Sequence, residues 1–160
     1  FFSGGSYKVK HNLDALIYIL KEILPFLKKK NITLNITGSK VPRSLLEIDD
    51  EFLKFWGYID EKDFLNFYRS MDVNIAPIIS GYGMQSKIFE PMSIGIPTLT
   101  FKKGLRGYAF SGGSEYLDLK ENLNDILFAH KVQKVSINSF KKSKKFFDYN
   151  FFEICEITAN

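Results

Sequence analysis

The sequence predicts a doubly wound α/β domain built on a parallel sheet, and two observations lead to this fold class. Short apolar runs typical of strands alternate along the chain with segments of helical periodicity. Their spacing is that of βαβ units, which implies parallel strands covered by helices on both faces. The chain has 160 residues, of which 45% are hydrophobic and 25% charged, as expected for one folded domain.

The first predicted unit covers residues 1–38. Phe1 and Phe2 begin a strand that leads into a loop containing Gly4 and Gly5. A helix is predicted to begin at Asn12, a good N-cap residue, and to end at the lysines of 28–30, which suit the negative end of the helix dipole. Its apolar stripe consists of Leu13, Leu16, Ile17, Leu20, Ile23, Leu24 and Leu27. The alternating stretch NITLNITG (31–38) predicts the second strand.

The elements that follow continue the alternation. A turn or short helix is expected over 42–48, then a strand in FLKFWGY (52–58) and a helix capped by Asp60. The runs VNIAPII (73–79) and PTLTF (97–101) predict two more strands, with a glycine loop and a helix between them. From Glu121 onward the pattern is helical, with a basic run KKSKK (141–145) and an aromatic end.

Composition narrows the function. The net charge is +4 and the pI about 9.0, which favours an anionic ligand without indicating nucleic acid. The single cysteine, Cys155, cannot form an intramolecular disulfide and favours a reducing compartment. No signal peptide, membrane-length apolar run or metal-ligand cluster is visible. Because Phe1 begins the chain directly in a predicted strand, we expect a fragment of a longer protein.

The stretch GYGMQSKIFEPMSIGIP (81–97) carries the chemistry. Gly81 and Gly83 let the backbone approach a ligand closely, and the N-terminus of the following helix suits a phosphate. Lys87 adds a cation, and Glu90, three residues on, projects from the same face. A carboxylate there would repel phosphate but can accept hydrogen bonds from the diol of a ribose. This combination indicates a nucleotide site; the alternative is a glycine turn into an ordinary helix with a surface Lys–Glu pair.

Together with the preceding GYG, the motif KIFEPMSIGIP resembles the donor-binding signature of the retaining GT-B glycosyltransferases of the glycosyl transferases group 1 family (GT4). The opening FSGGSYKVKHNLDAL, the strand LNITGS and the segment FWGYIDEKDFLNFYRSMDVNIAPI resemble further parts of the same C-terminal domain, in the same order. The resemblance covers about residues 1–119. It implies the donor-binding half of a glycosyltransferase.

Residue by residue, the resemblance implies that Glu90 binds the ribose hydroxyls and that Lys87 neutralises phosphate. Both are the best candidates for donor activation; no other catalytic residue is assigned. The remaining implied contacts are the pyrophosphate and sugar with Gly81, Tyr82 and Gly83, the pyrophosphate with Gly4, Gly5 and Ser6, and the base with Gly38 and Tyr58.

Three departures from the family pattern stand out. Tyr82 occupies a position where many members carry a second glutamate near the transferred sugar. Ser6 and His11 stand where many have an arginine and a lysine, although Lys8 or Lys10 is available to substitute. Pro91 removes a helical N–H, so we expect that the helix starts late or that its first turn is kinked.

The family implies a nucleotide-sugar donor, UDP- or GDP-linked, and a retaining transfer that needs no metal or other cofactor. The acceptor, a bacterial surface glycan or lipid-linked molecule of polysaccharide biosynthesis, would bind an absent N-terminal domain. We therefore expect the isolated domain to be inactive. The expected location is cytoplasmic, with peripheral contact at the inner face of the membrane if the basic run 141–145 docks to anionic lipid; the alternative is a solvated helix face.

Within the domain, 1–160, the helices of 120–160 are expected to contact the absent domain. The segment 146–157 carries six large apolar residues in nine positions, more than one helix stripe can bury against a single domain. Two other functions are considered. A GT-B sugar-nucleotide epimerase would be distinguished by its product. A receiver-like signalling domain would need an acidic pair after the first strand and an aspartate after the third, where SGG and GYID stand instead.

Overall fold

The computed structural model of the chain describes residues 1–83, 85–107 and 117–118. It contains six strands in two assigned sheets, ordered β1-β2-β3 and β4-β5-β6, with every assigned pair parallel. The strands are β1 (Phe2–Ser6), β2 (Leu34–Ser39), β3 (Leu53–Gly57), β4 (Asn74–Ala76), β5 (Thr98–Thr100) and β6 (Leu117–Asp118). The helices are α1 (Lys10–Tyr18), α2 (Leu24–Lys29), α3 (Arg43–Leu46), α4 (Glu61–Arg69) and α5 (Ser86–Ser93), with a π-helical segment η1 (Ile19–Ile23) and a 3-10 turn η2 (Lys102–Leu105).

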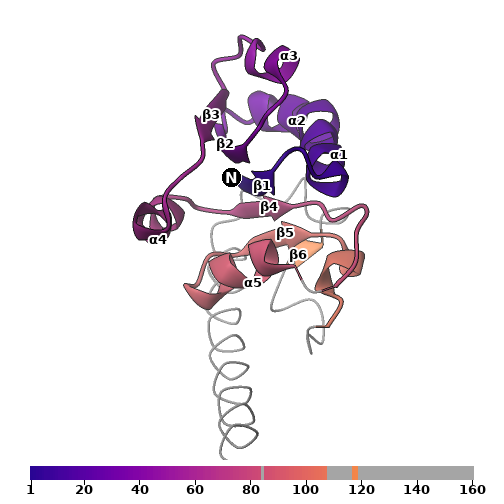
Figure 1. The fold of residues 1–160 in the computed structure, drawn as a ribbon. Helices are drawn as coiled ribbons and strands as arrows, with labels where there is room; N and C mark the ends of the chain where they lie inside the picture. Colours follow the sequence, from indigo (N-terminus) through magenta and orange to yellow (C-terminus); the bar gives the residue numbers. More distant parts are fainter. Residues whose placement is uncertain (84, 108–116, 119–160) are drawn as a thin grey trace, which may run out of the picture.

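Two backbone hydrogen bonds join the two sheets at β1 and β4. The nitrogen of Phe1 donates to the carbonyl of Val73, and the carbonyl of Phe1 accepts from the nitrogen of Ile75, each at 2.7 Å. In parallel strands, the N–H and the C=O of one residue bond to the two residues that flank its partner on the next strand. The overall order is therefore β3-β2-β1-β4-β5-β6, and Figure 1 shows β1 and β4 side by side. The predicted doubly wound α/β fold is confirmed.

The first predicted helix differs from expectation at its start and in its middle. It begins at Lys10 with Val9 as its N-cap, so the prediction that Asn12 caps it is wrong. The helix then passes through η1 before α2, because Pro25 has no N–H for the carbonyl four residues earlier. The wider turn rotates the apolar stripe, and Ile19, which lay outside the predicted stripe, becomes fully buried.

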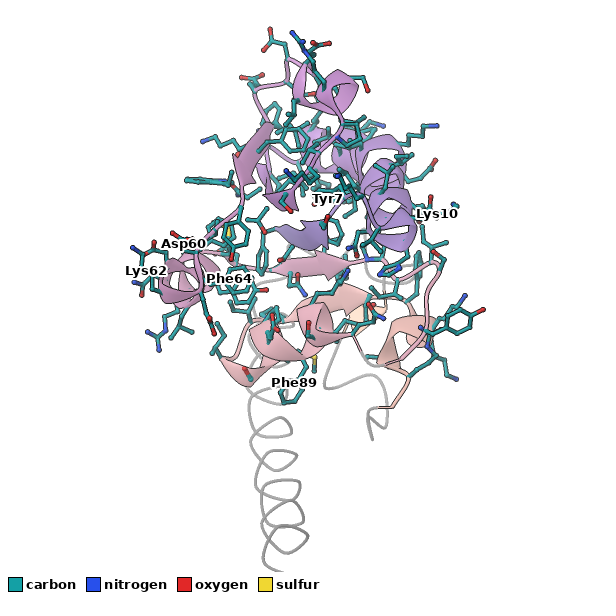
Figure 2. All side chains as sticks on the ribbon, viewed as in Figure 1. Tyr7, Lys10, Asp60, Lys62, Phe64 and Phe89 are labelled. Atoms are coloured by element: carbon teal, nitrogen blue, oxygen red, sulfur yellow. The ribbon has the colours of Figure 1, made fainter. Side chains whose placement is uncertain are left out.

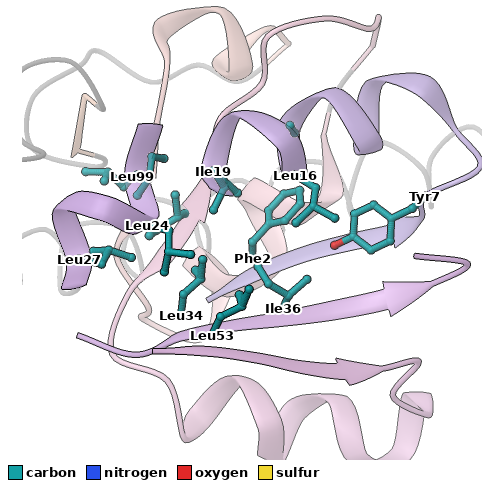
Figure 3. Close-up of a cluster of buried hydrophobic side chains, with 13 residues drawn as sticks. Phe2, Tyr7, Leu16, Ile19, Leu24, Leu27, Leu34, Ile36, Leu53 and Leu99 are labelled. Atoms are coloured by element: carbon teal, nitrogen blue, oxygen red, sulfur yellow. The ribbon is translucent and has the colours of Figure 1, made fainter. Parts of the chain in front are cut away.

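The main core lies between α1, η1, α2 and strands β1 and β2, as Figure 3 shows. It consists of Phe2, Tyr7, Ala15, Leu16, Ile19, Ile23, Leu24, Leu27, Leu34, Ile36, Leu53, Ile75 and Leu99. A smaller cluster of Ala76, Ile78, Ile88 and Met92 fixes α5 to the β4 side. The strand predicted over 73–79 is short, since Pro77 cannot donate to the ladder.

No helix in the described ranges is long and apolar enough to cross a membrane. The expectations for 120–160, including the basic run 141–145 and the aromatic segment 146–157, lie outside the residues that the structure describes.

Candidate functional site

A cleft of about 690 Å³ opens where the strand order reverses. The carboxyl-terminal parts of β1 and β2, the start of α1 and the segment from the end of β3 into α4 line it from one side, and the start of α5 lines it from the other. The lining residues are Ser3, Gly4, Gly5, His11, Asn12, Thr37, Gly38, Tyr58, Ile59, Glu61, Phe64, Gln85, Ser86, Lys87 and Glu90. Ligands of open α/β sheets bind at such a switch point, outside the carboxyl ends of the strands.

Glycines on the β1 side of this cleft are required by close packing. A Cβ atom added at Gly4 would lie 2.2 Å from the ring of Tyr7. At Gly38, where φ is +132°, an added Cβ would lie 2.5 Å from the carbonyl oxygen of Gly5. Tyr7 itself is buried, and its hydroxyl donates to the carbonyl of Thr37 at 2.8 Å. On this side, the cleft is therefore lined by glycine backbone that packs directly on the buried Tyr7 ring.

Helix α5 forms the opposite wall. Gln85 precedes it, and the Gln85 side-chain amide donates to the carbonyl of Tyr82 at 3.0 Å, which ties the glycine loop to the helix start. The helix begins at Ser86, so the expectation of a late start is wrong; Pro91 lies in its second turn.

A buried asparagine replaces the hydrogen bond that Pro91 removes. Because Pro91 has no N–H, the carbonyl of Lys87 has no helical partner four residues on. The side-chain amide of Asn74 in β4 donates to that carbonyl at 2.9 Å and to the hydroxyl of Thr98 at 3.1 Å. Asn74 is fully buried. The turn of α5 that carries the lysine is thus tied to the central sheet.

Lys87 reaches into the cleft from α5 toward the β1 side. Its ammonium Nζ donates to Oδ1 of Asn12 at 2.5 Å and lies 5.8 Å from the ring centre of Phe2. The Asn12 amide in turn donates to the carbonyl of Ser6 at 3.0 Å. Burial lowers the pKa of Lys87 to about 8, and the nearby charge of Glu90 opposes that shift in part. This desolvated cation is held at the switch point between β1 and β4.

Glu90 is exposed on the rim of the cleft. The Tyr68 hydroxyl donates to its carboxylate at 3.4 Å, a long bond that leaves most of the carboxylate free to accept other donors. Tyr68 belongs to an aromatic cluster with Phe1 and Phe64, and burial raises its pKa, so the hydroxyl stays a donor at neutral pH. Phe64 lies on α4, the left-hand helix of Figure 2.

Six of the ten predicted contact residues line this cleft: Gly4, Gly5, Gly38, Tyr58, Lys87 and Glu90. Gly81 and Tyr82 line a neighbouring cleft instead. Ser6 and Gly83 line neither, although the Ser6 carbonyl holds Asn12.

Sequence reasoning missed several lining residues, of which the polar ones are Ser3, Asn12, Thr37, Glu61, Gln85 and Ser86. Asn12 gave a usable signal, since a polar residue within the first helix needs a partner once buried. The others lie within β1 and β2 or at the starts of α4 and α5. Their place in the cleft depends on sheet order, which periodicity does not reveal.

The neighbouring cleft has a volume of about 490 Å³. It is lined by Lys10, His11, Asp14, Ser80, Gly81, Tyr82, Lys103 and Arg106, so His11 belongs to both clefts. Gly81 adopts φ +98°, and a Cβ there would lie 3.4 Å from the His11 ring. In the view of Figure 2, Lys10 and Phe64 lie on opposite sides of β1 and β4.

Comparison with solved structures finds the same fold in several glycosyltransferases. The Anabaena protein HepE, in complex with UDP and glucose, aligns with a TM-score of 0.70 and 18% identity over 99% of this chain and 48% of its own. The pneumococcal O-GlcNAc transferase GtfA, in complex with UDP and GlcNAc, gives 0.67 and 18% over 98% of this chain and 34% of its own. The C-terminal domain of the group 1 family protein LpcC from Francisella tularensis gives 0.65 and 17%, over 91% and 82%.

The chain therefore spans between a third and a half of HepE and GtfA, but most of the LpcC domain. No curated protein matches the sequence. The family model described as glycosyl transferases group 1 matches residues 1–135, most of the chain. With the strand order and the cleft at the β1–β4 switch point, this match shows that the chain belongs to the glycosyl transferases group 1 family and has the fold of a GT-B C-terminal domain.

Proposed function

We propose that this chain is the donor-binding domain of a glycosyltransferase and that a nucleoside diphosphate sugar binds in the 690 Å³ cleft. The observation that carries the proposal is the position of Lys87 and Glu90 together in the cleft at the switch point. UDP is favoured over GDP, because the pneumococcal and Anabaena enzymes of the same fold were solved with UDP.

Each wall of the cleft has its own role in this proposal. Glu90, exposed on the rim, accepts hydrogen bonds from the ribose hydroxyls. Lys87 and the N-terminal end of α5 face the diphosphate. Gly5 and Gly38 let the ligand approach the backbone, and Tyr58, at 72% exposure, flanks the base at the cleft mouth.

The chemistry that these residues favour is departure of the diphosphate. As the bond between the anomeric carbon and the phosphate oxygen breaks, its electron pair goes to the diphosphate, and Lys87 stabilises the added charge. This stabilisation requires neither proton transfer nor a metal. We accordingly propose a metal-independent, retaining transfer in which Lys87 and Glu90 hold and activate the donor.

The acceptor site belongs to a further domain in this proposal, so the chain studied alone binds donor without transferring it. We propose a surface glycan or a lipid-linked molecule as acceptor, at the cytoplasmic face of the membrane. Product analysis with the complete enzyme separates transfer from epimerisation, since only transfer lengthens the acceptor.

Calorimetric titration of the chain with UDP and GDP tests donor binding. The Glu90→Ala variant should bind UDP more weakly by about 1.5–3 kcal/mol, because hydrogen bonds to a charged acceptor are lost. Glu51→Ala is the matched control, since Glu51 is exposed and lies outside both clefts. Equal UDP affinity in wild type and Glu90→Ala, with circular dichroism unchanged, would place the ribose elsewhere.

A further inference from the structure

Among the residues that the structure describes, the linings of the two clefts differ in charge. The larger one has a single lysine, Lys87, against the carboxylates of Glu61 and Glu90. The smaller one has Lys10, Lys103 and Arg106 against a single carboxylate, Asp14. The smaller cleft therefore carries an excess of positive charge that its described residues do not balance.

Among the residues that the structure describes, Arg106 has the most buried side-chain nitrogen atoms without a hydrogen-bond partner. Its Nε and Nη2 atoms are buried, and within the described part of the chain neither has a hydrogen-bond partner. Arg106 as a whole is only half-buried and also lines the smaller cleft. A guanidinium is always charged, and its planar shape suits a carboxylate or phosphate. Arg106 follows η2 directly, where the buried Gly104 leaves no room for a Cβ: one would lie 2.6 Å from the Thr100 hydroxyl.

The two lysines of this cleft are already oriented. Lys103 donates to the carbonyl of Ile79 at 2.9 Å, which ties η2 to the segment after β4. Lys10 pairs with Asp14 at 2.8 Å. Each ammonium has three donors, so both keep capacity for a further acceptor. The pairing of Lys10 cancels the one carboxylate, and Lys103 and Arg106 remain as the excess charge.

The smaller cleft continues from the larger one at His11, which lines both. Gly81 lies against His11, and a Cβ added there would be 3.4 Å from the His11 ring. A volume of about 490 Å³ is within the range of small-ligand pockets. A neutral group in this space would leave the positive charge of Lys103 and Arg106 uncompensated, whereas an anion would offset it.

We propose that the cleft of Lys10, His11, Lys103 and Arg106 is a second anion subsite, which binds a carboxylate or phosphate group other than the donor diphosphate. The inference rests on the proposed function, because it places this anion beside a bound nucleotide sugar. The anion comes either from the transferred sugar, as the carboxylate of a uronic acid, or from the acceptor, as a phosphate. Arg106 binds the anion directly, and the ammonium groups of Lys10 and Lys103 attract it through their positive charge.

Calorimetric titration of the full chain with UDP, UDP-glucose and UDP-glucuronate tests the donor source. If the donor sugar carries the anion, the wild type binds UDP-glucuronate about tenfold more tightly than UDP-glucose. Arg106→Gln abolishes that difference and leaves UDP affinity unchanged. Arg106→Lys keeps charge without the planar guanidinium and retains only part of the preference. Arg69→Gln is the matched control, because Arg69 is exposed and lines neither cleft.

The acceptor source is tested by titrating inorganic phosphate and glycerol phosphate into the chain saturated with UDP. If the acceptor carries the anion, the wild type binds these phosphates, Arg106→Gln does not, and the two UDP-sugars bind alike. Two outcomes overturn the subsite. In one, Arg106→Gln weakens UDP itself as much as the acidic sugar, so the arginine serves the diphosphate. In the other, the Arg106→Gln variant folds and binds each of these ligands with the same affinity as the wild type. A wild type that fails to bind UDP at all contradicts the proposed function instead.

Discussion

The glycines on the two sides of the switch point serve different purposes. On the β1 side, Gly4 and Gly38 touch the Tyr7 ring and the backbone, and an added Cβ would lie 2.2–2.6 Å from these atoms. On the β4 side, Gly83 adopts φ +72° with nothing within 4 Å of an added Cβ, and Gly81 has ordinary contact with His11. The first pair is required by packing, and the second by backbone conformation alone.

This difference separates residues that build the cleft from residues that border it. The β1 side lies on the large core, whose side chains pack between strands β1 and β2 and the helices α1, η1 and α2 (Figure 3). The β4 side rests on a cluster of four buried residues, and hydrogen bonds from Asn74 and Gln85 hold its helix and loop. Substitutions on the β1 side should therefore reduce stability, whereas several on the β4 side should change binding first.

The largest effect is expected for Gly38→Ala. The methyl group would meet the Gly5 carbonyl at 2.5 Å, in a backbone conformation that alanine rarely adopts. Overpacking and strain together should lower the free energy of unfolding by about 2–5 kcal/mol in urea titrations. Gly57→Ala is the control, since Gly57 also has positive φ but open space around it. If both variants lose the same free energy of unfolding, glycine is needed at position 38 for its backbone conformation and not for packing.

Asn74→Ala should cost about 1–3 kcal/mol of unfolding free energy, because the carbonyl of Lys87 loses its donor. In a Pro91→Ala background the cost should be smaller, since alanine restores a helical N–H for that carbonyl. Urea titrations of the four proteins form a double-mutant cycle. If the losses of the two substitutions are additive, the Asn74 amide does not replace the N–H that Pro91 lacks.

Lys87 should make nucleotide affinity depend on pH. Its pKa of about 8 means that it is charged below pH 8 and neutral above. Because a diphosphate binds the charged form better, affinity should fall by up to about tenfold, or about 1.4 kcal/mol, between pH 7 and 9. Titrations at pH 8 in buffers of different ionisation enthalpy should show proton uptake, and Lys87→Met should abolish it. Lys62→Met, on the exposed face of α4, is the control.

The stability of the unliganded chain should respond in the opposite direction. The pKa of Lys87 is about 8 when folded and 10.5 when unfolded. Between these values the unfolded chain binds more protons, so the contribution of Lys87 to stability rises with pH. A nucleotide affinity that stays flat across pH 8, with this stability trend present, would place the diphosphate away from Lys87.

The smallest effect is expected for Gly83→Ala, at about 1 kcal/mol of unfolding free energy, since only the left-handed conformation is penalised. Gly83→Asn should cost less, because asparagine tolerates that conformation. A loss in Gly83→Ala as large as that in Gly38→Ala would remove the distinction between the two sides of the switch point.

Much of this arrangement was predictable from local patterns. The alternation of apolar runs with helical periods indicated the parallel α/β fold, and the spacing of Lys87 and Glu90 placed both on one helix that borders the cleft. The resemblance of the ordered motifs identified the family that the match over residues 1–135 establishes.

What could not be predicted depends on contacts between distant segments. Asn12 was expected to be a helix cap, but it binds Lys87, 75 positions away, once β1 and β4 are adjacent. Asn74 can likewise donate to the Lys87 carbonyl, in place of the N–H that Pro91 lacks, only because α5 packs on β4. Arg106 carried no motif, and only the fold brings it beside Lys10 and His11.

The central claim, that a nucleoside diphosphate binds at the switch point, is tested most directly by an NMR titration of the ¹⁵N-labelled chain with UDP. We predict that the amides of Gly4, Gly5, Gly38, Ser86 and Lys87 shift first and saturate together, and that Glu90→Ala weakens this response. Shifts confined to residues outside the cleft, such as the exposed face of α4 or the run 141–145, would contradict the claim.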